Sequence, residues 1–157
     1  MRTILRWSLF IRFSIAFVLC SVLACTLQVE KDEVNDQHYV FGPKVGSWLN
    51  DTVFRFCCNG SISTHSSDFD KGKYEILITA KGTQAYNVYP HIQVSLNNKA
   101  LRMIQLDSNY ATYHIPFSLS EKQNIGLQVL FDQDGLDGNG NDRDVLIRKI
   151  SVVPAEK

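Results

Sequence analysis

The sequence predicts an all-β protein, an antiparallel β-sandwich or jelly roll that follows an N-terminal signal segment. Apolar and polar residues alternate with a period of two in several short segments, as they do in half-buried strands, and no segment has a convincing helical period. Turn-forming residues separate these segments at regular spacing, which is typical of sandwiches. With 157 residues, of which 45% are hydrophobic and 20% charged, one globular domain is expected.

Several expected strands end at residues that disfavour further extension. The first strand stops at Asn59-Gly60 and a later one at Asn97-Asn98, and both dipeptides favour tight turns. Pro116 is expected to break another strand, because proline cannot donate a ladder hydrogen bond. The predicted strands cover residues 53–57, 74–80, 91–96, 102–106, 110–115, 125–131 and 145–153.

The N-terminal residues 1–25 have the composition of a signal peptide. Three arginines precede an apolar run, residues 13–24, which is short for a membrane-spanning helix. The end of this run resembles a bacterial lipobox, in which Cys25 is lipidated and becomes the mature N-terminus. Cleavage after Ala24 without lipid and an uncleaved anchor are the alternatives, and in each case the domain leaves the cytoplasm. Residues 26–38 are polar and acidic and are expected to be a tether, and the domain occupies 39–157.

Charge and cysteine content exclude several classes of function. Sixteen basic residues balance sixteen acidic ones, and no basic stripe invites nucleic acid. No second cysteine pair has a zinc spacing. Cys57 and Cys58 are adjacent, so a bond between them would be strained, and we expect one to face the core and the other solvent.

The most informative segment is residues 132–144, which contains five aspartates interleaved with glycines. Oxygen donors on a tight, glycine-permitted loop are what Ca²⁺ requires, at roughly 6–8 oxygens per ion. An EF-hand pattern beginning at Asp137 fails, because Asp142 and Arg148 stand where glycine and glutamate are needed. The expected site is therefore framed by strands. Three alternatives remain: a calcium ion that also contacts a ligand, one that only stabilises the fold, and a solvated loop without an ion.

Residues 72–153 resemble the calcium-dependent, xylan-binding class of carbohydrate-binding modules. The resemblance rests on the following residues, in chain order: Ala80-Lys81-Gly82, Pro90-His91-Ile92, Phe131, Gln133-Asp134, Asp137 and Asp142-Arg143-Asp144, before the last strand. It implies a β-sandwich that holds Ca²⁺ in a loop at or beside the ligand cleft, with two adjacent sugar hydroxyls completing the coordination of the ion.

The resemblance also implies the site residues. Asp134 and Asp142 match the two carboxylates that hold the ion and so contact the ligand through it, and Asp137 is a third candidate. Asn139 and Asn141 lie where backbone or amide oxygens complete the shell. The chain departs from the family pattern at the following positions, which puts the preferred glycan in doubt: Gln133, Gly135, Leu136 and Asp144. Asp144 is expected to pair with Arg143 rather than with the ion.

Four other side chains lie outside these motifs. Tyr86 and Tyr89 lie in a loop between two strands, where exposed tyrosines can stack on sugar faces, and the alternative for Tyr89 is packing under the sheet edge. Trp48 is expected in the core, and His91 is expected to be a hydrogen-bonded structural residue.

An enzyme is not expected. Residues 65–68 contain the residue types of a catalytic triad, but in adjacent positions, whereas a working triad converges from separate segments. The sequence therefore predicts a non-catalytic module, secreted and lipid-anchored, that binds polysaccharide through Ca²⁺. The alternative is a structural or protein-interaction sandwich in which calcium only orders the loop.

Overall fold

The computed structural model describes residues 39–41, 45–64 and 66–155, and every regular element in these residues is a strand. The predicted signal segment, the tether and Cys25 lie outside them. No helix that could cross a membrane occurs within the described residues. In chain order the strands are β1 (Tyr39–Phe41), β2 (Gly46–Asn50), β3 (Val53–Phe56), β4 (Gly60–Thr64), β5 (Ser67–Phe69), β6 (Gly72–Gly82), β7 (His91–Leu96), β8 (Lys99–Gln105), β9 (Ala111–Leu119), β10 (Gln123–Ile125), β11 (Leu127–Phe131) and β12 (Val145–Pro154).

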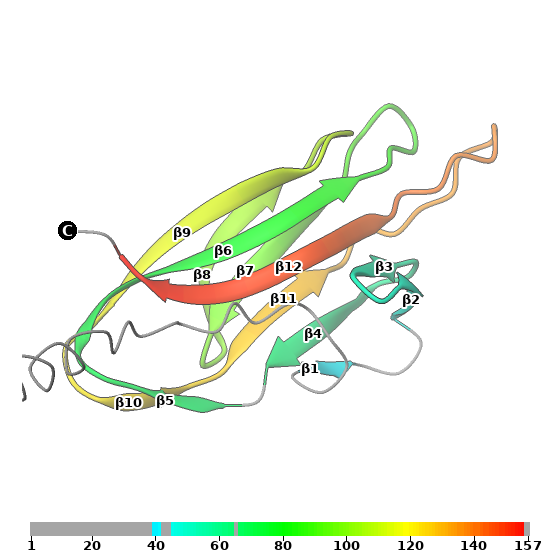
Figure 1. The fold of residues 1–157 in the computed structure, drawn as a ribbon. Coiled ribbons are helices and arrows are strands. Elements are labelled where there is room, and N and C mark those ends of the chain that lie inside the picture. The colour runs from blue at the N-terminus through cyan, green and yellow to red at the C-terminus, as the bar shows by residue number, and fades with distance from the viewer. Residues whose placement is uncertain (1–38, 42–44, 65, 156–157) are drawn as a thin grey trace, which may run out of the picture. The chain divides into compact units, whose positions relative to one another are not determined.

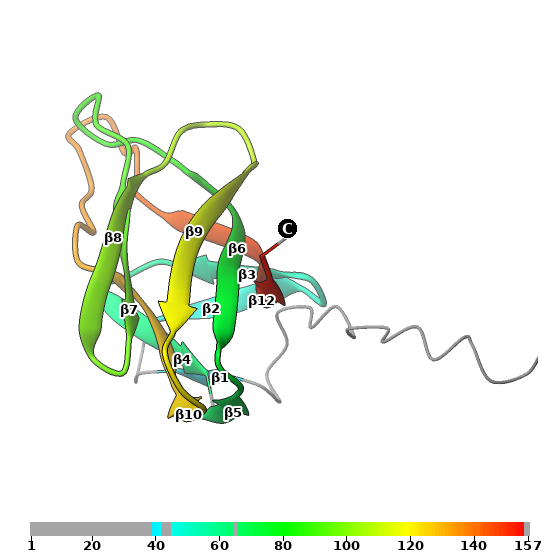
Figure 2. The same ribbon diagram turned by 90° about the vertical axis from the view of Figure 1, so that its left-hand side faces the viewer.

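The strands form a sandwich of two antiparallel sheets, so the predicted fold class is confirmed (Figures 1 and 2). One sheet has the order β1-β4-β11-β7-β8 and the other β2-β3-β12-β6-β9, while β5 and β10 make a short two-stranded sheet. Apart from the hairpins β2–β3 and β7–β8, neighbouring strands in each sheet come from distant parts of the sequence. The pairing of β3 with β12, for example, places Arg55 opposite Leu146.

The core lies between the two large sheets and is built from the inward residues of the alternating strands. Ile76, Ile78 and Ala80 on β6 are fully buried, and the intervening residues are more exposed. Phe54, Phe56 and Phe131 form a chain of edge-to-face contacts, with ring centroids 5.2 and 6.1 Å apart. Such pairs add about 0.5–1.5 kcal/mol to the effect of burial.

Two of the sequence predictions at the sheet edges have clear outcomes. The turn at Asn97-Asn98 is confirmed, because both residues have positive φ (47° and 64°) between β7 and β8, as a tight hairpin turn requires. The predicted break at Pro116 is wrong, since β9 continues through it and Pro116 pairs with Glu75. β9 is an outer strand, where alternate N–H groups face solvent and proline is tolerated.

Other elements differ from the prediction in their boundaries. The predicted strand at 125–131 is interrupted at Gly126, which separates β10 from β11. Four further strands, β1, β2, β4 and β5, were not predicted, because they are three to five residues long and have little periodic signal. Trp48 packs against the core and meets Phe54 edge to face, as expected.

Candidate functional site

Two long loops project from the same end of the sandwich and lie side by side (Figures 1 and 2). Loop A, residues 83–90, connects β6 to β7, and loop B, residues 132–144, connects β11 to β12. The turn at residues 57–59, between β3 and β4, contacts the base of loop B through Asn59. These three segments form the candidate functional site.

Loop B is a narrow extension rather than an open acidic coil. Leu136 and Asp142 form an antiparallel bridge, and the N–H of Asp137 donates to the carbonyl of Asn141 at 2.9 Å. Gly140 has a φ of 79°, a conformation that favours glycine, and its N–H donates to the carbonyl of Asp137. The backbone of the loop therefore satisfies much of its own hydrogen bonding.

The Asp137 carboxylate organises the tip of loop B. It accepts hydrogen bonds from the N–H groups of Asn139 (2.8 Å) and Asn141 (2.9 Å) and from the side-chain amide of Asn141 (2.9 Å). The N–H of Tyr86 in loop A adds a longer bond of 3.4 Å. The bonds from Asn141 lower the pKa of Asp137 most, to about 2. Asp137 thus stabilises the loop by accepting local hydrogen bonds.

We expect Asn141→Ala to raise the pKa of Asp137 towards its ordinary value, because this variant removes the amide that donates at 2.9 Å. Since the folded-state pKa is depressed, the contribution of Asp137 to stability is present above its unfolded pKa and is lost as the pH falls towards about 2. An NMR titration of the Asp137 carboxyl carbon measures the shift. Asn139→Ala is the matched control, because Asn139 bonds Asp137 through its backbone N–H. Equal shifts in both variants would contradict this assignment.

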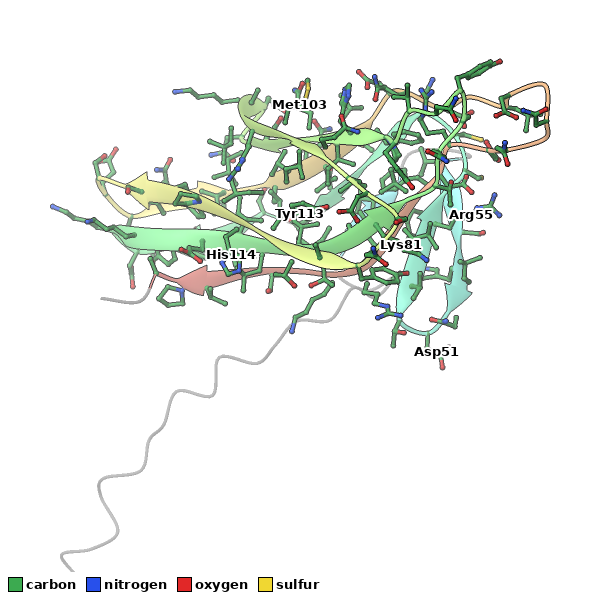
Figure 3. All side chains as sticks on the ribbon, turned by 90° about the horizontal axis from the view of Figure 1, so that it is seen from above. Asp51, Arg55, Lys81, Met103, Tyr113 and His114 are labelled. Carbon is green, nitrogen blue, oxygen red and sulfur yellow. The ribbon has the colours of Figure 1, made fainter. Side chains whose placement is uncertain are left out.

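Asp144 is buried at the base of loop B and is paired with Arg55. The guanidinium of Arg55 donates to one carboxylate oxygen of Asp144 through Nε (2.8 Å) and Nη2 (2.7 Å), and Nη2 also lies 3.5 Å from Asp142. The expected pair of Asp144 with Arg143 is therefore wrong: the pairing of β3 with β12 places Arg55 beside Asp144 instead. Figure 3 places Arg55 at the end of the sandwich that carries loop B.

The electrostatic state of Asp144 is governed by burial. Burial raises its pKa, the bond to Arg55 opposes this, and the charges of Asp142 and Asp134 raise it further. The other carboxylate oxygen, Oδ1, is buried without a hydrogen-bond partner among the described residues. Such an atom is costly to leave unpaired and is open to a cation or a water molecule.

Arg143 joins the two loops through backbone carbonyl groups. Its guanidinium donates to the carbonyls of Val88 (3.1 Å) and Ala85 (2.9 Å) in loop A, and to that of Gln133 (3.1 Å) in loop B. Thr83 adds a hydroxyl bond to the carbonyl of Asp142. The position of loop A relative to loop B is therefore fixed by several bonds.

Tyr86 is exposed at the tip of loop A and leans on loop B. Its hydroxyl donates to the carbonyl of Leu136 at 2.8 Å, and its φ of 55° belongs to a tight turn shared with Asn87. Val88, two residues after Tyr86, is also exposed, and so is Leu136, whose carbonyl accepts this bond. Tyr89 is half-buried, and its carbonyl accepts a bond from Gln105 (2.7 Å). Tyr86 therefore presents its ring at the site more openly than Tyr89.

The backbone of His91 is hydrogen-bonded near the start of loop B, whereas its ring makes no hydrogen bond to the described residues. Its N–H donates to the side-chain carbonyl of Gln133 at 3.2 Å, and its Nε2 lies 3.6 Å from Asp132. The side chain is 20% exposed. These two contacts tie the first residue of β7 to the point where loop B leaves β11.

Asp134 differs from the other acidic residues of loop B. Its N–H donates to the side-chain oxygen of Asn59 at 2.7 Å, whereas its exposed carboxylate has no bonding partner among the described residues. The charges of Asp134 and Asp142 both help to raise the pKa of Cys58, after the larger effects of the Cys57 hydrogen bond and burial. The charges of Asp134 and Asp142 thus act on both Cys58 and Asp144, so these acidic residues belong to one region at the base of loop B.

The donor set of this region fits a hard divalent cation in its chemistry. Loop B contains five aspartates and one arginine, and Arg55 adds a second guanidinium, which leaves an excess of three negative charges. Oδ1 of Asp144 has no partner among the described residues. Within the described part of the chain, no three acidic, histidine or cysteine side chains converge as a preformed metal site. Of the five predicted ligands, Asn139 donates to Asp137 through its backbone N–H, Asn141 donates to it through its side-chain amide as well, and Asp142 faces Arg55. Asp134 is the carboxylate with open access.

Solved structures of carbohydrate-binding modules have the same fold. The CBM36-1 domain of a multidomain xylanase from the hindgut metagenome of Trinervitermes trinervoides aligns over 77% of this chain and 94% of its own, with 13% identity and a TM-score of 0.57. A CBM36 module in complex with calcium and xylotriose aligns over 78% and 99%, with 11% identity and a TM-score of 0.53. These likenesses establish the jelly-roll fold.

Part of an enzyme also aligns with the chain. An acetyl xylan esterase from Butyrivibrio proteoclasticus matches with a TM-score of 0.54 and 9% identity over 79% of this chain, but over only 32% of the esterase. No protein-family model matches the sequence, and no curated protein matches it. Structural likeness thus shows the fold alone.

Proposed function

We propose that this protein is a non-catalytic polysaccharide-binding module, with the candidate site around loops A and B as its glycan site and Ca²⁺ as its cofactor. The observation that carries the proposal is the acid-rich loop B, with its excess of negative charge, held beside an exposed tyrosine at one end of a jelly roll. A similar module was solved with calcium and xylotriose, which supports both ligands.

Asp134 and Asp142 are the residues that would hold the ion, because the Asp134 carboxylate is exposed without a partner among the described residues and Asp142 is half-exposed. Bound Ca²⁺ would supply a hard cation to which two neighbouring sugar hydroxyls can bind. Asp137 and Arg143 would act without contacting sugar, by holding the tip of loop B and the position of loop A.

Tyr86 would position the sugar. Its hydroxyl is occupied by the carbonyl of Leu136, so its ring rather than its hydrogen-bonding group is available. The exposed side chains of Val88 and Leu136 extend this apolar surface, which suits the C–H faces of a pyranose. A xylan-like polysaccharide, which presents such faces with adjacent hydroxyls, is the ligand class we propose.

The state of the acidic residues supports binding rather than hydrolysis. A glycosidase keeps one carboxylic acid protonated near neutral pH within a cleft. The pKa of Asp137 is lowered to about 2, the opposite direction. The pKa of Asp144 is raised, but this side chain is buried and bonded to Arg55.

Display outside the cell completes the proposal. The predicted signal segment and the lipidation of Cys25 would tether many copies to one surface. Modules of this kind bind weakly one at a time, so retention of a polymer would rely on multivalency.

Affinity electrophoresis in gels containing xylan, with and without Ca²⁺, tests the function. We expect retention in Ca²⁺, loss with a chelator and recovery when Ca²⁺ is restored. A glycan array then identifies the preferred sugar. A rise in Tm with Ca²⁺ while no glycan binds would instead favour the structural sandwich, and turnover of a glycoside that survives chelation would favour a hydrolase.

A further inference from the structure

Two adjacent cysteines beside the candidate site have sulfur atoms that face each other. Cys57 and Cys58 follow directly after β3, both are half-buried, and their Sγ atoms are 3.7 Å apart. The expectation that one faces the core and the other solvent is wrong. The alternation of a strand ends with β3 at Phe56, and the chain bends at residues 58 and 59. The bend brings the two thiols together as a vicinal pair.

The segment that carries these thiols also carries contacts to loop B. Asn59, the next residue, accepts the backbone N–H of Asp134 at 2.7 Å. Arg55, two residues before Cys57, binds Asp144 and approaches Asp142. On the opposite side, the N–H of Cys57 donates to the carbonyl of Val45 at 3.2 Å. A change of backbone torsion at residues 57–58 therefore has a direct route to Asp134 through Asn59.

We propose that Cys57 and Cys58 are a redox modification site: they form a reversible vicinal disulfide, and its formation displaces Asn59 and with it Asp134. The effect on ligand binding rests on the proposed function, whereas the disulfide itself and the displacement do not. The oxidant is a small disulfide or a disulfide-forming oxidoreductase, as found outside the cytoplasm.

The chemistry is a two-step thiol–disulfide exchange. The thiolate of one cysteine attacks the oxidant disulfide, breaks its S–S bond and forms a mixed disulfide, while one sulfur of the oxidant leaves as a thiolate. The second cysteine then loses its proton and attacks the protein sulfur of the mixed disulfide, which forms the Cys57–Cys58 bond and releases the other half of the oxidant. Two electrons pass from the protein to the oxidant, which is reduced to two thiols.

The adjacency of the two residues makes the bond labile. Consecutive Cα atoms are about 3.8 Å apart, closer than the roughly 4.4–6.8 Å of ordinary disulfides. A vicinal disulfide is therefore strained, and strained disulfides are the more easily reduced, regulatory kind. The backbone at residues 57–59 has to adjust when the ring closes, which is why the contact between Asn59 and Asp134 is expected to change.

Peptide mapping by mass spectrometry of the full chain tests the bond itself. After equilibration with oxidised glutathione, we expect the peptide that contains residues 57 and 58 to lose two hydrogen atoms, and to regain them in excess reduced glutathione. Mapping separates this bond from any that involves Cys20 or Cys25. A stable glutathione adduct, a bond to another cysteine or an unchanged peptide would overturn the proposal.

The displacement of Asp134 has a readout that needs no ligand. In NMR spectra of the oxidised protein we expect the backbone amide signal of Asp134 to move, with no movement in Cys57→Ser or Cys58→Ser under the same conditions. The reduced wild-type protein is a second reference if a serine variant folds poorly. A disulfide that forms while the Asp134 amide signal stays in place would refute the displacement.

A binding measurement then tests whether the disulfide affects the candidate site. A neutral hydrogen bond contributes about 1 kcal/mol, so loss of the bond between Asn59 and Asp134 is expected to weaken xylan retention in Ca²⁺ by about fivefold in the oxidised protein. Retention that is equal in the two redox states would remove the functional consequence. Absence of retention in both states would count against the proposed function alone, because the mass and NMR results stand independently.

Discussion

Replacing Arg55 with alanine is expected to destabilise the fold by about 2–3 kcal/mol at neutral pH. Removing one partner of a buried ion pair costs about 3–5 kcal/mol, because the other charge stays buried and uncompensated. We expect about 2–3 kcal/mol rather than the full cost, because the Asp144 side chain is 7% exposed but that of Arg55 is 35% exposed. Both oxygens of Asp144 would then lack partners, since Oδ1 already has none among the described residues.

The loss of stability in Arg55→Ala should depend on pH, and the raised pKa of Asp144 determines its direction. Burial raises this pKa in the folded state, so the folded protein binds the proton more tightly than the unfolded chain does. The resulting stability is present below the unfolded pKa and is lost as the pH rises through the folded pKa. In Arg55→Ala the opposing effect of the guanidinium is gone. The variant should therefore approach the wild type in acid and fall behind as the pH rises.

Urea unfolding of both proteins across a pH series measures this difference. The matched control is the double variant Arg55→Ala, Asp144→Asn, in which the buried charge is absent and part of the stability at neutral pH should return. A constant difference between Arg55→Ala and the wild type at every pH would mean that Asp144 is not the group that Arg55 stabilises.

This ion pair also marks what the sequence could not reveal. The strand around residue 55 was predicted from the local alternation of Phe54, Arg55 and Phe56, which places arginine outward. Its partner is set by the pairing of β3 with β12, a non-local register that local periodicity does not encode. The nearer neighbour Arg143 was therefore assigned to Asp144, although its guanidinium binds three carbonyls instead.

Loop B was recognised from its composition, yet the roles of its residues were only partly predictable. Asp137 followed at two and four residues by asparagine, with glycines between, is also the pattern of an aspartate that accepts local backbone N–H groups. That signal was present and was interpreted as a ligand set. Asn59 and Thr83 bring distant segments against the loop, and neither has a sequence signature. The five predicted metal ligands remain a prediction.

The substitution with the largest expected effect on ligand binding should leave the stability of the fold almost unchanged. Asp134→Ala should weaken retention on xylan in Ca²⁺ by at least about 100-fold, because loss of even an outer-shell partner of a metal costs about 10–100-fold. Its free energy of unfolding should change by less than about 0.5 kcal/mol, since the carboxylate is exposed and unbonded among the described residues. Affinity electrophoresis and urea unfolding of one preparation measure both quantities.

Asp142→Ala should weaken retention on xylan to a similar degree. It should also lower the free energy of unfolding more than Asp134→Ala does, because Asp142 lies 3.5 Å from the guanidinium of Arg55. Asp51→Ala is the matched control: it removes the same carboxylate from the exposed turn between β2 and β3 and should leave retention unchanged. If both site variants bind xylan as the wild type does, an ion bridging these carboxylates to sugar is the wrong mechanism. If Asp134→Ala alone retains binding, Asp142 and Asp144 Oδ1 become the remaining oxygen donors of this region to test next.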